Sequence, residues 1–252
     1  MMFNKQIVGL AERVLSQGQG ALSYEEACGL ARLPAAETLD LLACSHKITR
    51  AAKPEEPIRC SILNAKSGFC TEDCAFCAQS SHHRTEIPRY DLEPEEAMVE
   101  AARERHQAGA THYSMVTSGL TLTDREIAAV CGAGRRVGEE TGMKVCASLG
   151  TLTPEKAARL RESGITTYHH NLETARSFFD QVCTTHAYDE DIATLRIVRA
   201  AGLKVCSGGI MGLGESWEQR VEFACTLREL DVDRIPLNFL NPIPGTRMEN
   251  RP

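Results

Sequence analysis

The sequence predicts an α/β protein with a TIM-type (β/α) barrel. Six β-rich runs recur along the chain, and helical patterns fill the gaps between them. This alternation requires a parallel sheet, and polar or glycine-rich segments follow the runs at the end where a barrel carries its functional groups. The length of 252 residues, with 42% hydrophobic and 25% charged side chains, suits one large α/β domain.

Composition narrows the classes of partner. The formal net charge is −6, and acidic and basic residues are interspersed along the predicted helices. A general nucleic-acid surface needs clustered Lys and Arg side chains, so no nucleic-acid partner is expected. Since no apolar run approaches the roughly 18 residues of a membrane span, we expect a soluble, cytoplasmic protein that binds a small molecule.

Residues 1–52 are expected to form a helical extension ahead of the barrel. Apolar residues there recur with a helical period, and breaks separate two or three short helices. We expect this extension to act as a packing cap or a dimer contact, without chemistry of its own. The run Lys53-Pro-Glu-Glu-Pro57 marks the predicted boundary with a barrel domain at residues 53–252.

Recognisable signals bound the predicted strands and helices. The strands lie near residues 58–64, 112–117, 144–149, 166–172, 204–210 and 234–240. Thr123 and Glu126 form a capping box at the start of one helix, and Thr153 precedes a proline at the first position of another. Helices are expected to stop at three glycines, Gly109, Gly164 and Gly202.

A period of two along the strands predicts which side chains point into the barrel. In chain order they are Ser114, Val116 and Ser118, then Cys146 and Ser148, then His169, Asn171 and Glu173, and last Cys206 and Gly208. Only six strand units precede Pro252, two short of a closed (β/α)8 barrel. We therefore expect a barrel that is incomplete at its C-terminal end, or an open three-quarter barrel.

Three cysteines share one loop after the first predicted strand, in the run Cys70-Thr-Glu-Asp-Cys74-Ala-Phe-Cys77. A cubane [4Fe–4S] cluster usually takes four thiolates, so three from one loop leave one iron open to a substrate or cosubstrate. A zinc site completed by His82 or His83 is an alternative, although structural zinc sites more often pair two CxxC-like motifs. Six other cysteines are expected to pack as reduced core thiols: Cys28, Cys44, Cys60, Cys131, Cys183 and Cys225.

With these features in hand, the sequence resembles the biotin synthase family of radical S-adenosyl-L-methionine (SAM) enzymes. The resemblance runs from about residue 55 to the end of the chain. It is carried by the segments Asn64–Gly68, Cys70–Ser81, Cys146–Leu152, Tyr168–Thr174 and Lys204–Glu215. The spacing of the loop cysteines alone indicates only the radical SAM superfamily, whereas the segments together are specific.

The resemblance implies roles for residues at matching positions. The ligands of the [4Fe–4S] cluster, whose open iron binds SAM, would be Cys70, Cys74 and Cys77. The SAM nucleoside would contact Phe76, Asn171, Glu173, Gly208, Ile210, Gly212 and Glu215. Taken alone, Asn171 also suits a strand-end turn, Glu173 a helix cap, and Gly208 with Gly209 a bulge.

The family also holds an auxiliary iron–sulfur cluster, [2Fe–2S] or a variant, which is consumed as the sulfur source. Cys146 and Cys206 match two of its ligands. The family commonly has a further cysteine where this chain has Ser114, and a hydroxyl is a poorer iron ligand than a thiolate. With Ser114 there, a [2Fe–2S] cluster on Cys146 and Cys206 would need other partners. A later arginine of the family pattern would lie beyond Pro252.

The implied reaction inserts sulfur into dethiobiotin to give biotin, the last step of biotin biosynthesis. The chemistry is centred on the cofactors, and His169 and Asn238 would face the substrate, although His169 also suits a histidine that only hydrogen-bonds its neighbours. Flavodoxin or ferredoxin would supply electrons, and a second copy would complete a homodimer. The alternatives are another radical SAM enzyme of the same subgroup, and a non-catalytic protein that uses the cysteine loop as a metal staple.

Overall fold

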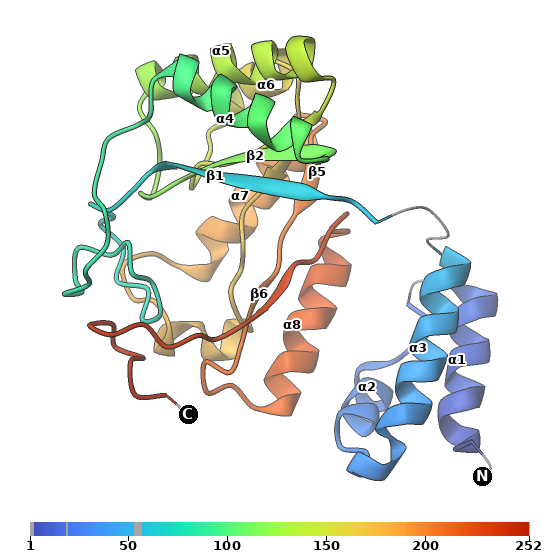
Figure 1. The fold of residues 1–252 in the computed structure, drawn as a ribbon. Helices are drawn as coiled ribbons and strands as arrows, with labels where there is room; N and C mark the ends of the chain where they lie inside the picture. Colours follow the sequence, from blue (N-terminus) through green and yellow to red (C-terminus); the bar gives the residue numbers. More distant parts are fainter. Residues whose placement is uncertain (1–2, 19, 53–56, 252) are drawn as a thin grey trace.

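Parallel strands form the wall of a partial barrel in the computed structural model, which describes residues 3–18, 20–52 and 57–251 (Figure 1). One sheet contains, in spatial order, β1 (Cys60–Lys66), β2 (His112–Thr117), β3 (Lys144–Ser148), β4 (Ile165–His169) and β5 (Lys204–Cys206). A second parallel pair joins β6 (Gly209–Met211) to β7 (Leu237–Phe239). Bridges from Glu173 to Gly209 and from Cys206 to Arg234 continue the wall between them, so the predicted α/β architecture with six strand positions is confirmed.

Helices follow the strands along the chain and cover the outside of the wall (Figure 1). They are α4 (Glu95–Gln107), α5 (Asp124–Thr141), α6 (Pro154–Glu162), the 3-10 helix η2 (Arg176–Gln181), α7 (Tyr188–Ala200) and α8 (Trp217–Glu229). The predicted capping box between Thr123 and Glu126 opens α5, and Thr153 caps α6. The helix stops are confirmed as well, because Gly109, Gly164 and Gly202 adopt φ angles of 89°, 89° and 76° directly after their helices.

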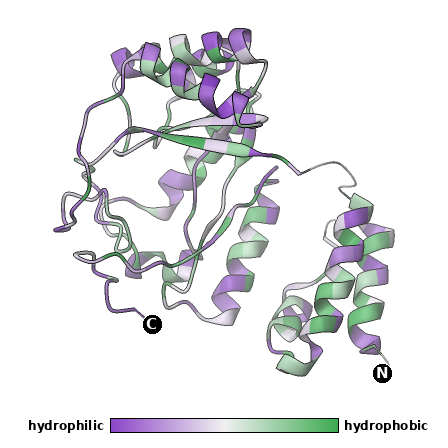
Figure 2. Cartoon of the chain, viewed as in Figure 1, coloured by the Kyte–Doolittle hydropathy of each residue, from purple (hydrophilic) through white to green (hydrophobic). Residues whose placement is uncertain are grey.

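The hydrophobic core lies between the wall and these helices. Tyr113, Met115, Ile165 and Tyr168 are fully buried on the outward faces of β2 and β4. Hydrophobic and hydrophilic residues alternate along the outer helices (Figure 2), and their buried residues, such as Val99, Ile127 and Leu195, belong to this core. Because outward strand residues fill this core, the alternate residues of the same strands are left to line the inside of the barrel.

The fifth predicted strand is interrupted after Cys206. A Cβ atom at Gly208 would lie 1.8 Å from the Pro236 carbonyl oxygen, and one at Gly209 would lie 2.2 Å from the Glu173 carbonyl oxygen. Backbones from two neighbouring segments therefore pack directly against these glycines. The chain leaves one strand pairing and begins the next at this point, which explains why the predicted run 204–210 appears as β5 and β6.

The N-terminal segment forms α1 (Lys5–Gln17), α2 (Tyr24–Ala31), a 3-10 turn η1 (Ala35–Glu37) and α3 (Thr38–Ala52). This bundle contacts α8 through an ion pair of 2.5 Å between Arg32 and Glu218. Arg228 also donates a hydrogen bond of 3.0 Å to the Leu22 carbonyl oxygen. Most of the predicted boundary at 53–57 lies outside the described residues, and the division into two domains stays a prediction.

Among the described helices, none combines the length and the apolar character that a membrane crossing requires. Within the same part of the chain, β1 pairs only with β2, and β7 pairs only with β6. All three residues of β7 are exposed, including Phe239 at 82%.

Candidate functional site

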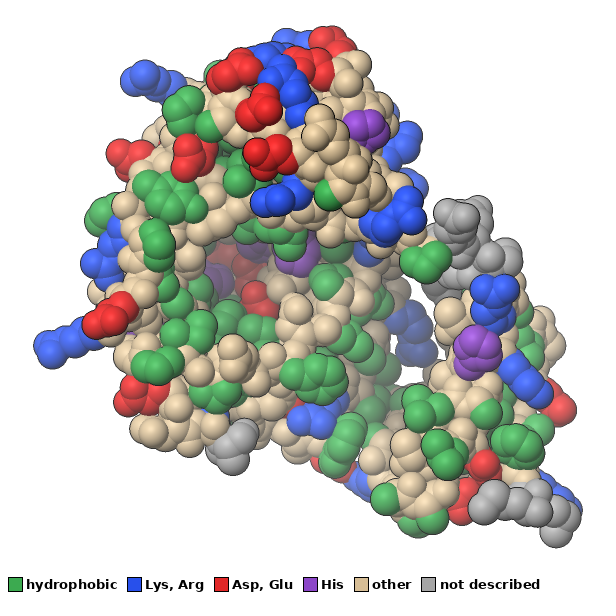
Figure 3. Space-filling view, in the orientation of Figure 1, with side chains coloured by type: hydrophobic (Ala, Val, Ile, Leu, Met, Phe, Trp, Pro, Cys, Tyr) green, Lys and Arg blue, Asp and Glu red, His purple; other side chains and the backbone are tan. Residues whose placement is uncertain are grey.

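The cysteine loop, residues 70–77, directs its three thiols into one cavity. The Cys77 N–H donates to the Cys74 carbonyl oxygen at 2.9 Å, and the Ser81 N–H donates to the Cys70 carbonyl oxygen at 2.8 Å, so the loop closes on itself. Cys70, Cys74 and Cys77 line the same cavity of about 410 Å³, which we call the loop cavity. Figure 3 shows a hollow in the barrel with acidic and histidine side chains deep inside it.

Asp73 ties the cysteine loop to the segment that precedes α7. Its carboxylate accepts hydrogen bonds from the Thr184 N–H at 2.8 Å and the Thr184 hydroxyl at 2.7 Å. These bonds lower the pKa of Asp73 although burial opposes ionisation, and the guanidinium of Arg247 adds to the effect. Arg247 also donates to the Asp73 carbonyl oxygen at 2.6 Å, so the loop is fixed from two sides.

The inward side chains predicted from strand periodicity line two cavities. The loop cavity is lined by Val116, Ser118, Ser148, His169, Asn171 and Glu173 as well as the thiols. A second cavity of about 350 Å³, which we call the barrel cavity, is lined by Ser114, Val116, Cys146, His169 and Cys206. The predicted inward faces are thus confirmed, with the exception of Gly208, which contacts the segment before β7 instead.

Asn171 and Glu173 interact with each other at the end of β4. Asn171 Oδ1 accepts a hydrogen bond from the Gly208 N–H at 2.9 Å, and its Nδ2 donates to Glu173 Oε2 at 3.3 Å. Glu173 adopts a left-handed φ of 63°, which turns the chain toward η2. Burial raises the pKa of Glu173 to about 7, partly offset by the Asn171 hydrogen bond. The two side chains form one unit in which the amide orients the carboxyl group.

The four residues of the Gly-x-Ile-x-Gly-x-x-Glu segment contact other parts of the protein itself. Position 208 requires a glycine because the backbone of Pro236, in the protein's own neighbouring segment, packs directly against it. Gly212 has a φ of 96°, and its N–H donates to Glu215 Oε1 at 2.9 Å. Arg220 Nε pairs with the same oxygen at 2.7 Å. Ile210 and Phe76 both pack against a small hydrophobic cluster that includes Ala75 of the cysteine loop.

The barrel cavity contains a third thiol and an arginine that the sequence pattern did not indicate. Cys60 on β1 and Arg234 on the segment before β7 both line it. A hydrogen bond with Cys146, assisted by the charge of Arg234, lowers the pKa of Cys60 to about 7. The hydrogen bond with Cys60, together with burial, raises the pKa of Cys146. Burial raises the pKa of Cys206 to about 11.

His169 lies where the two cavities meet, since it lines both. Its Nδ1 is 3.3 Å from Cys206 Sγ. Burial, with a smaller effect of the His170 charge, lowers the pKa of His169 to about 4. The imidazole is therefore neutral at physiological pH and can donate or accept one hydrogen bond at each nitrogen.

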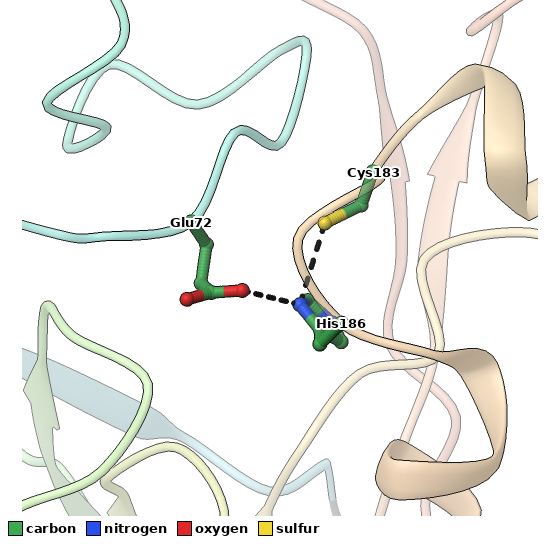
Figure 4. Close-up of side chains that lie close together, drawn as sticks. All are labelled: Glu72, Cys183 and His186. Atoms are coloured by element: carbon green, nitrogen blue, oxygen red, sulfur yellow. Dashed lines mark hydrogen bonds and ion pairs between the residues drawn. The ribbon is translucent and has the colours of Figure 1, made fainter.

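A buried polar group beside the cysteine loop was also not anticipated from the sequence. Glu72 Oε2 is 2.6 Å from His186 Nδ1, and Cys183 Sγ is 3.3 Å from the same nitrogen (Figure 4). Asp191 Oδ2 lies 3.4 Å from His186 Nε2, and Asp191 Oδ1 bonds His170 at 2.8 Å. The order of Glu72, Cys183 and His186 in the sequence carries no regular spacing that could have identified the group.

Several predicted residues lie outside both cavities. His82 Nε2 and His83 Nδ1 contact the carbonyl oxygens of Thr71 and Cys77, each at 2.9 Å, and neither histidine lines the loop cavity. Asn238 lies exposed on β7 and lines neither cavity. The histidine that would complete a zinc site and the asparagine expected near substrate are thus not brought to the thiols. Cys183 is buried in the core as predicted, but it also lines the loop cavity.

Comparison with known proteins agrees with this geometry. Residues 65–227 match the radical SAM superfamily. The chain is 56% identical over 251 residues to the biotin synthase of Syntrophus aciditrophicus (strain SB), covering 100% of this chain and 77% of that protein. It is 54% identical over 231 residues to the biotin synthase of Nitratidesulfovibrio vulgaris (strain Hildenborough), covering 92% of this chain and 64% of that protein.

Solved structures with low sequence identity share the fold. Methylornithine synthase is 20% identical with a TM-score of 0.83, over 96% of this chain and 70% of that chain. HydG, a maturase of the [FeFe]-hydrogenase, is 19% identical with a TM-score of 0.76, over 96% of this chain and 58% of that chain. The chain therefore belongs to the radical SAM superfamily and, within it, to the biotin synthase family, radical SAM enzymes that insert sulfur to make biotin.

Proposed function

We propose that this chain converts dethiobiotin to biotin with a [4Fe–4S] cluster and SAM bound in the loop cavity. The observation that carries the proposal is that the three loop thiols line one cavity with Asn171 and Glu173. Three thiolates leave one iron for SAM, while an amide and a carboxyl group beside them suit the hydroxyls of a ribose. Family membership supports the same assignment.

The donor set fits the cofactors. Cys70, Cys74 and Cys77 would hold the cluster, and their soft sulfur atoms suit iron. Among the described residues, the buried Thr117 hydroxyl in the same cavity has no hydrogen-bond partner, so it is available to a ligand. When bound, the reduced cluster would supply the electron that splits SAM into methionine and a 5′-deoxyadenosyl radical, which removes hydrogen from unactivated carbon.

The residues around the nucleoside would orient it. Asn171 keeps Glu173 in place, and the ionised carboxylate would accept hydrogen bonds from the ribose hydroxyls. Phe76 and Ile210 belong to one apolar cluster, which suits the flat face of an adenine. Gly212 and Glu215 would act one step further out, by fixing the turn that follows β6.

The auxiliary iron–sulfur cluster would occupy the barrel cavity with Cys60, Cys146 and Cys206 as ligands. Ser114 on β2 pairs with Cys146 on β3 in register. The resemblance implies that the family commonly has a cysteine at the position of Ser114. Cys60, on the neighbouring strand β1, would supply the missing thiolate, and its lowered pKa favours that form near neutral pH. The guanidinium of Arg234 would balance negative charge.

Dethiobiotin would lie where the two cavities meet. Ile62, Val116 and His169 line both cavities, so a substrate there would reach the nucleoside on one side and the sulfur donor on the other. The neutral imidazole of His169 would offer a hydrogen bond to the ureido ring. The exposed Asn238 would contact substrate only if the chain beyond β6 moved inward.

Other partners are part of the proposal. Flavodoxin or ferredoxin would deliver electrons, the protein would work in the cytoplasm, and two copies would form a homodimer. All eleven cysteines carry free thiols, which suits a reducing compartment.

Anaerobic reconstitution with iron and sulfide tests the proposal. We expect the reduced protein to form 5′-deoxyadenosine and biotin from SAM and dethiobiotin. Cys74→Ala should abolish both products because one cluster ligand is lost, whereas Cys131→Ala, on the outer helix α5, should keep both. Nucleoside without biotin would indicate another radical SAM enzyme of the same subgroup. Stoichiometric zinc without acid-labile sulfide would indicate a structural metal staple.

The ligand assignment in the barrel cavity needs its own variant. Cys60→Ala should lose the iron and sulfide of the auxiliary cluster and the formation of biotin, while reductive cleavage of SAM persists. Iron and sulfide contents equal to those of Cys131→Ala would exclude Cys60 as a ligand.

A further inference from the structure

A basic side chain lies at one end of the barrel cavity. Arg234 comes shortly before β7, and its backbone bridges to Cys206 at the end of β5. Among the described residues, it is the only lysine or arginine that lines this cavity. The neighbouring carboxylate, Asp233, pairs with Arg199 at 2.9 Å instead. In the described part of the chain, the guanidinium is therefore not neutralised by a carboxylate partner.

The guanidinium reaches across the barrel to β2. Its Nη2 atom is 3.0 Å from Nε2 of His112, the first residue of β2. His112 is only 9% exposed, and its backbone pairs in register with Cys60, the first residue of β1. The Arg234 side chain thus spans from the segment beside Cys206 to the strand pair that carries Cys60.

The hydrogen bonds around His112 fix which of its ring nitrogens carries the proton. A guanidinium can only donate, so His112 Nε2 must accept and carries no proton. A neutral imidazole has one N–H, which therefore lies on Nδ1. Thr111 Oγ1 is 3.0 Å from this nitrogen and can accept from it, because the hydroxyl donates its own proton to the Arg59 carbonyl oxygen at 3.3 Å.

The imidazole of His112 is neutral in this arrangement. A protonated ring would present an N–H to the guanidinium, and two positive charges would meet at 3.0 Å. In agreement, burial and the charges of Arg234, Lys144 and Lys204 lower the pKa of His112. The ring therefore offers one acceptor, and Arg234 uses it.

Building on the proposed function, we propose that His112 holds the Arg234 guanidinium at the barrel cavity, where its charge raises the reduction potential of the auxiliary iron–sulfur cluster. His112 is a positioning residue that acts through Arg234. A cluster held by thiolates gains negative charge when it is reduced, so a nearby cation stabilises the reduced state. Without the acceptor at Nε2, the long arginine side chain would regain its rotamer freedom and leave this position.

Redox titration of the reconstituted protein tests this role. It is read at the iron–sulfur signal that SAM does not change, which separates the auxiliary cluster from the SAM cluster. His112→Ala and Arg234→Ala should each lower the midpoint potential, and the double variant should lower it no further than Arg234→Ala alone. His46→Ala, an exposed histidine on α3, should leave it unchanged. Equal potentials in Arg234→Ala and wild type, or additive losses in the double variant, overturn the inference.

Two conservative variants separate the positioning of Arg234 from simple support of the strand. Glutamine places its amide oxygen near the position of Nε2 and can accept from Arg234, whereas asparagine places its amide near Nδ1 and can contact only Thr111. His112→Gln should keep the wild-type potential, and His112→Asn should lower it. The reverse order would show that His112 only supports β2, and it overturns the inference. This pair also decides the question if His112→Ala does not fold.

The position of the proton can be measured without any cofactor. Nitrogen-15 NMR of the iron-free, reduced protein, labelled at histidine, should show His112 near neutral pH as a neutral ring with its proton on Nδ1. The His112→Gln variant assigns the signal. A ring that carries a proton on Nε2 overturns the inference.

The outcomes separate this inference from the proposed function. A wild-type protein without a second, SAM-insensitive cluster overturns the function proposed for the barrel cavity and this inference with it. Two normal clusters, with a potential that neither His112→Ala nor His112→Asn changes, overturn the role of His112 alone.

Discussion

Replacing Glu173 by glutamine tests the electrostatic cost of the site. In the unfolded chain this carboxyl group titrates near 4.5, and in the folded protein burial raises its pKa to about 7. The folded state therefore binds more protons than the unfolded state between these pH values, and stability decreases as the pH rises through this window. At about 1.4 kcal/mol per pH unit, the full cost above pH 7 is roughly 3 kcal/mol. This is a ceiling, because the Glu173 side chain keeps some contact with solvent.

Glutamine carries no charge at any of these pH values, so Glu173→Gln escapes the cost. We expect urea unfolding of the iron-free, reduced protein to show the variant more stable than the wild type by less than about 1 kcal/mol at pH 5. At pH 8 the variant should be more stable by about 2–3 kcal/mol. Its affinity for SAM should fall in the reconstituted protein, because the carboxylate is the proposed ribose acceptor.

Glu215→Gln is the matched control. Burial opposes ionisation of Glu215, but hydrogen bonds from Gly212 and its own backbone, with Arg220, lower its pKa. Removing its charge should destabilise the protein at pH 7, the opposite sign. A stability difference between Glu173→Gln and wild type that stays constant from pH 5 to 8 would refute the reasoning.

Two further predictions concern the scaffold. Gly208→Ala places a Cβ atom 1.8 Å from a backbone oxygen of the segment before β7, so thermal unfolding should show a loss of stability of at least ~2 kcal/mol. In Gly138→Ala, on α5, the new Cβ atom meets nothing within 4 Å. This variant should be as stable as the wild type or more stable by about 0.5–1 kcal/mol. Equal effects of the two changes would contradict this. Thr123→Ala removes the cap of α5 and should cost about 1 kcal/mol in urea unfolding, and a change below about 0.3 kcal/mol would contradict the role of the cap.

Strand periodicity was enough to predict the inner surface of the barrel. Ser114, Cys146, His169 and Cys206 line the barrel cavity because a strand alternates its faces and the outward face fills the core. The helix caps were also predictable, because each cap depends on residues that are close together in the sequence, such as Thr123 and Glu126. The break after Cys206 was not, because it depends on the approach of Pro236, which is distant in sequence.

The residues that the sequence did not reveal are those brought in by tertiary contacts. The prediction that Cys60 packs as a core thiol was wrong, because Cys60 is exposed on β1. Strand pairing brings it beside Cys146 and Arg234 in the barrel cavity. Cys183 was expected to be buried, and it is, but its place in the lining of the loop cavity depends on how the segment after η2 folds back. Conversely, Glu215 matches a family motif, yet its hydrogen bonds show that it holds a turn.

The central claim is that the loop thiols leave one iron of the cluster free for SAM. Mössbauer spectroscopy of protein reconstituted with ⁵⁷Fe, recorded with and without SAM, tests it most directly. We predict that SAM changes the parameters of one iron in each [4Fe–4S] cluster and leaves three unchanged. A spectrum in which all irons have protein ligands and SAM changes none of them would contradict the account.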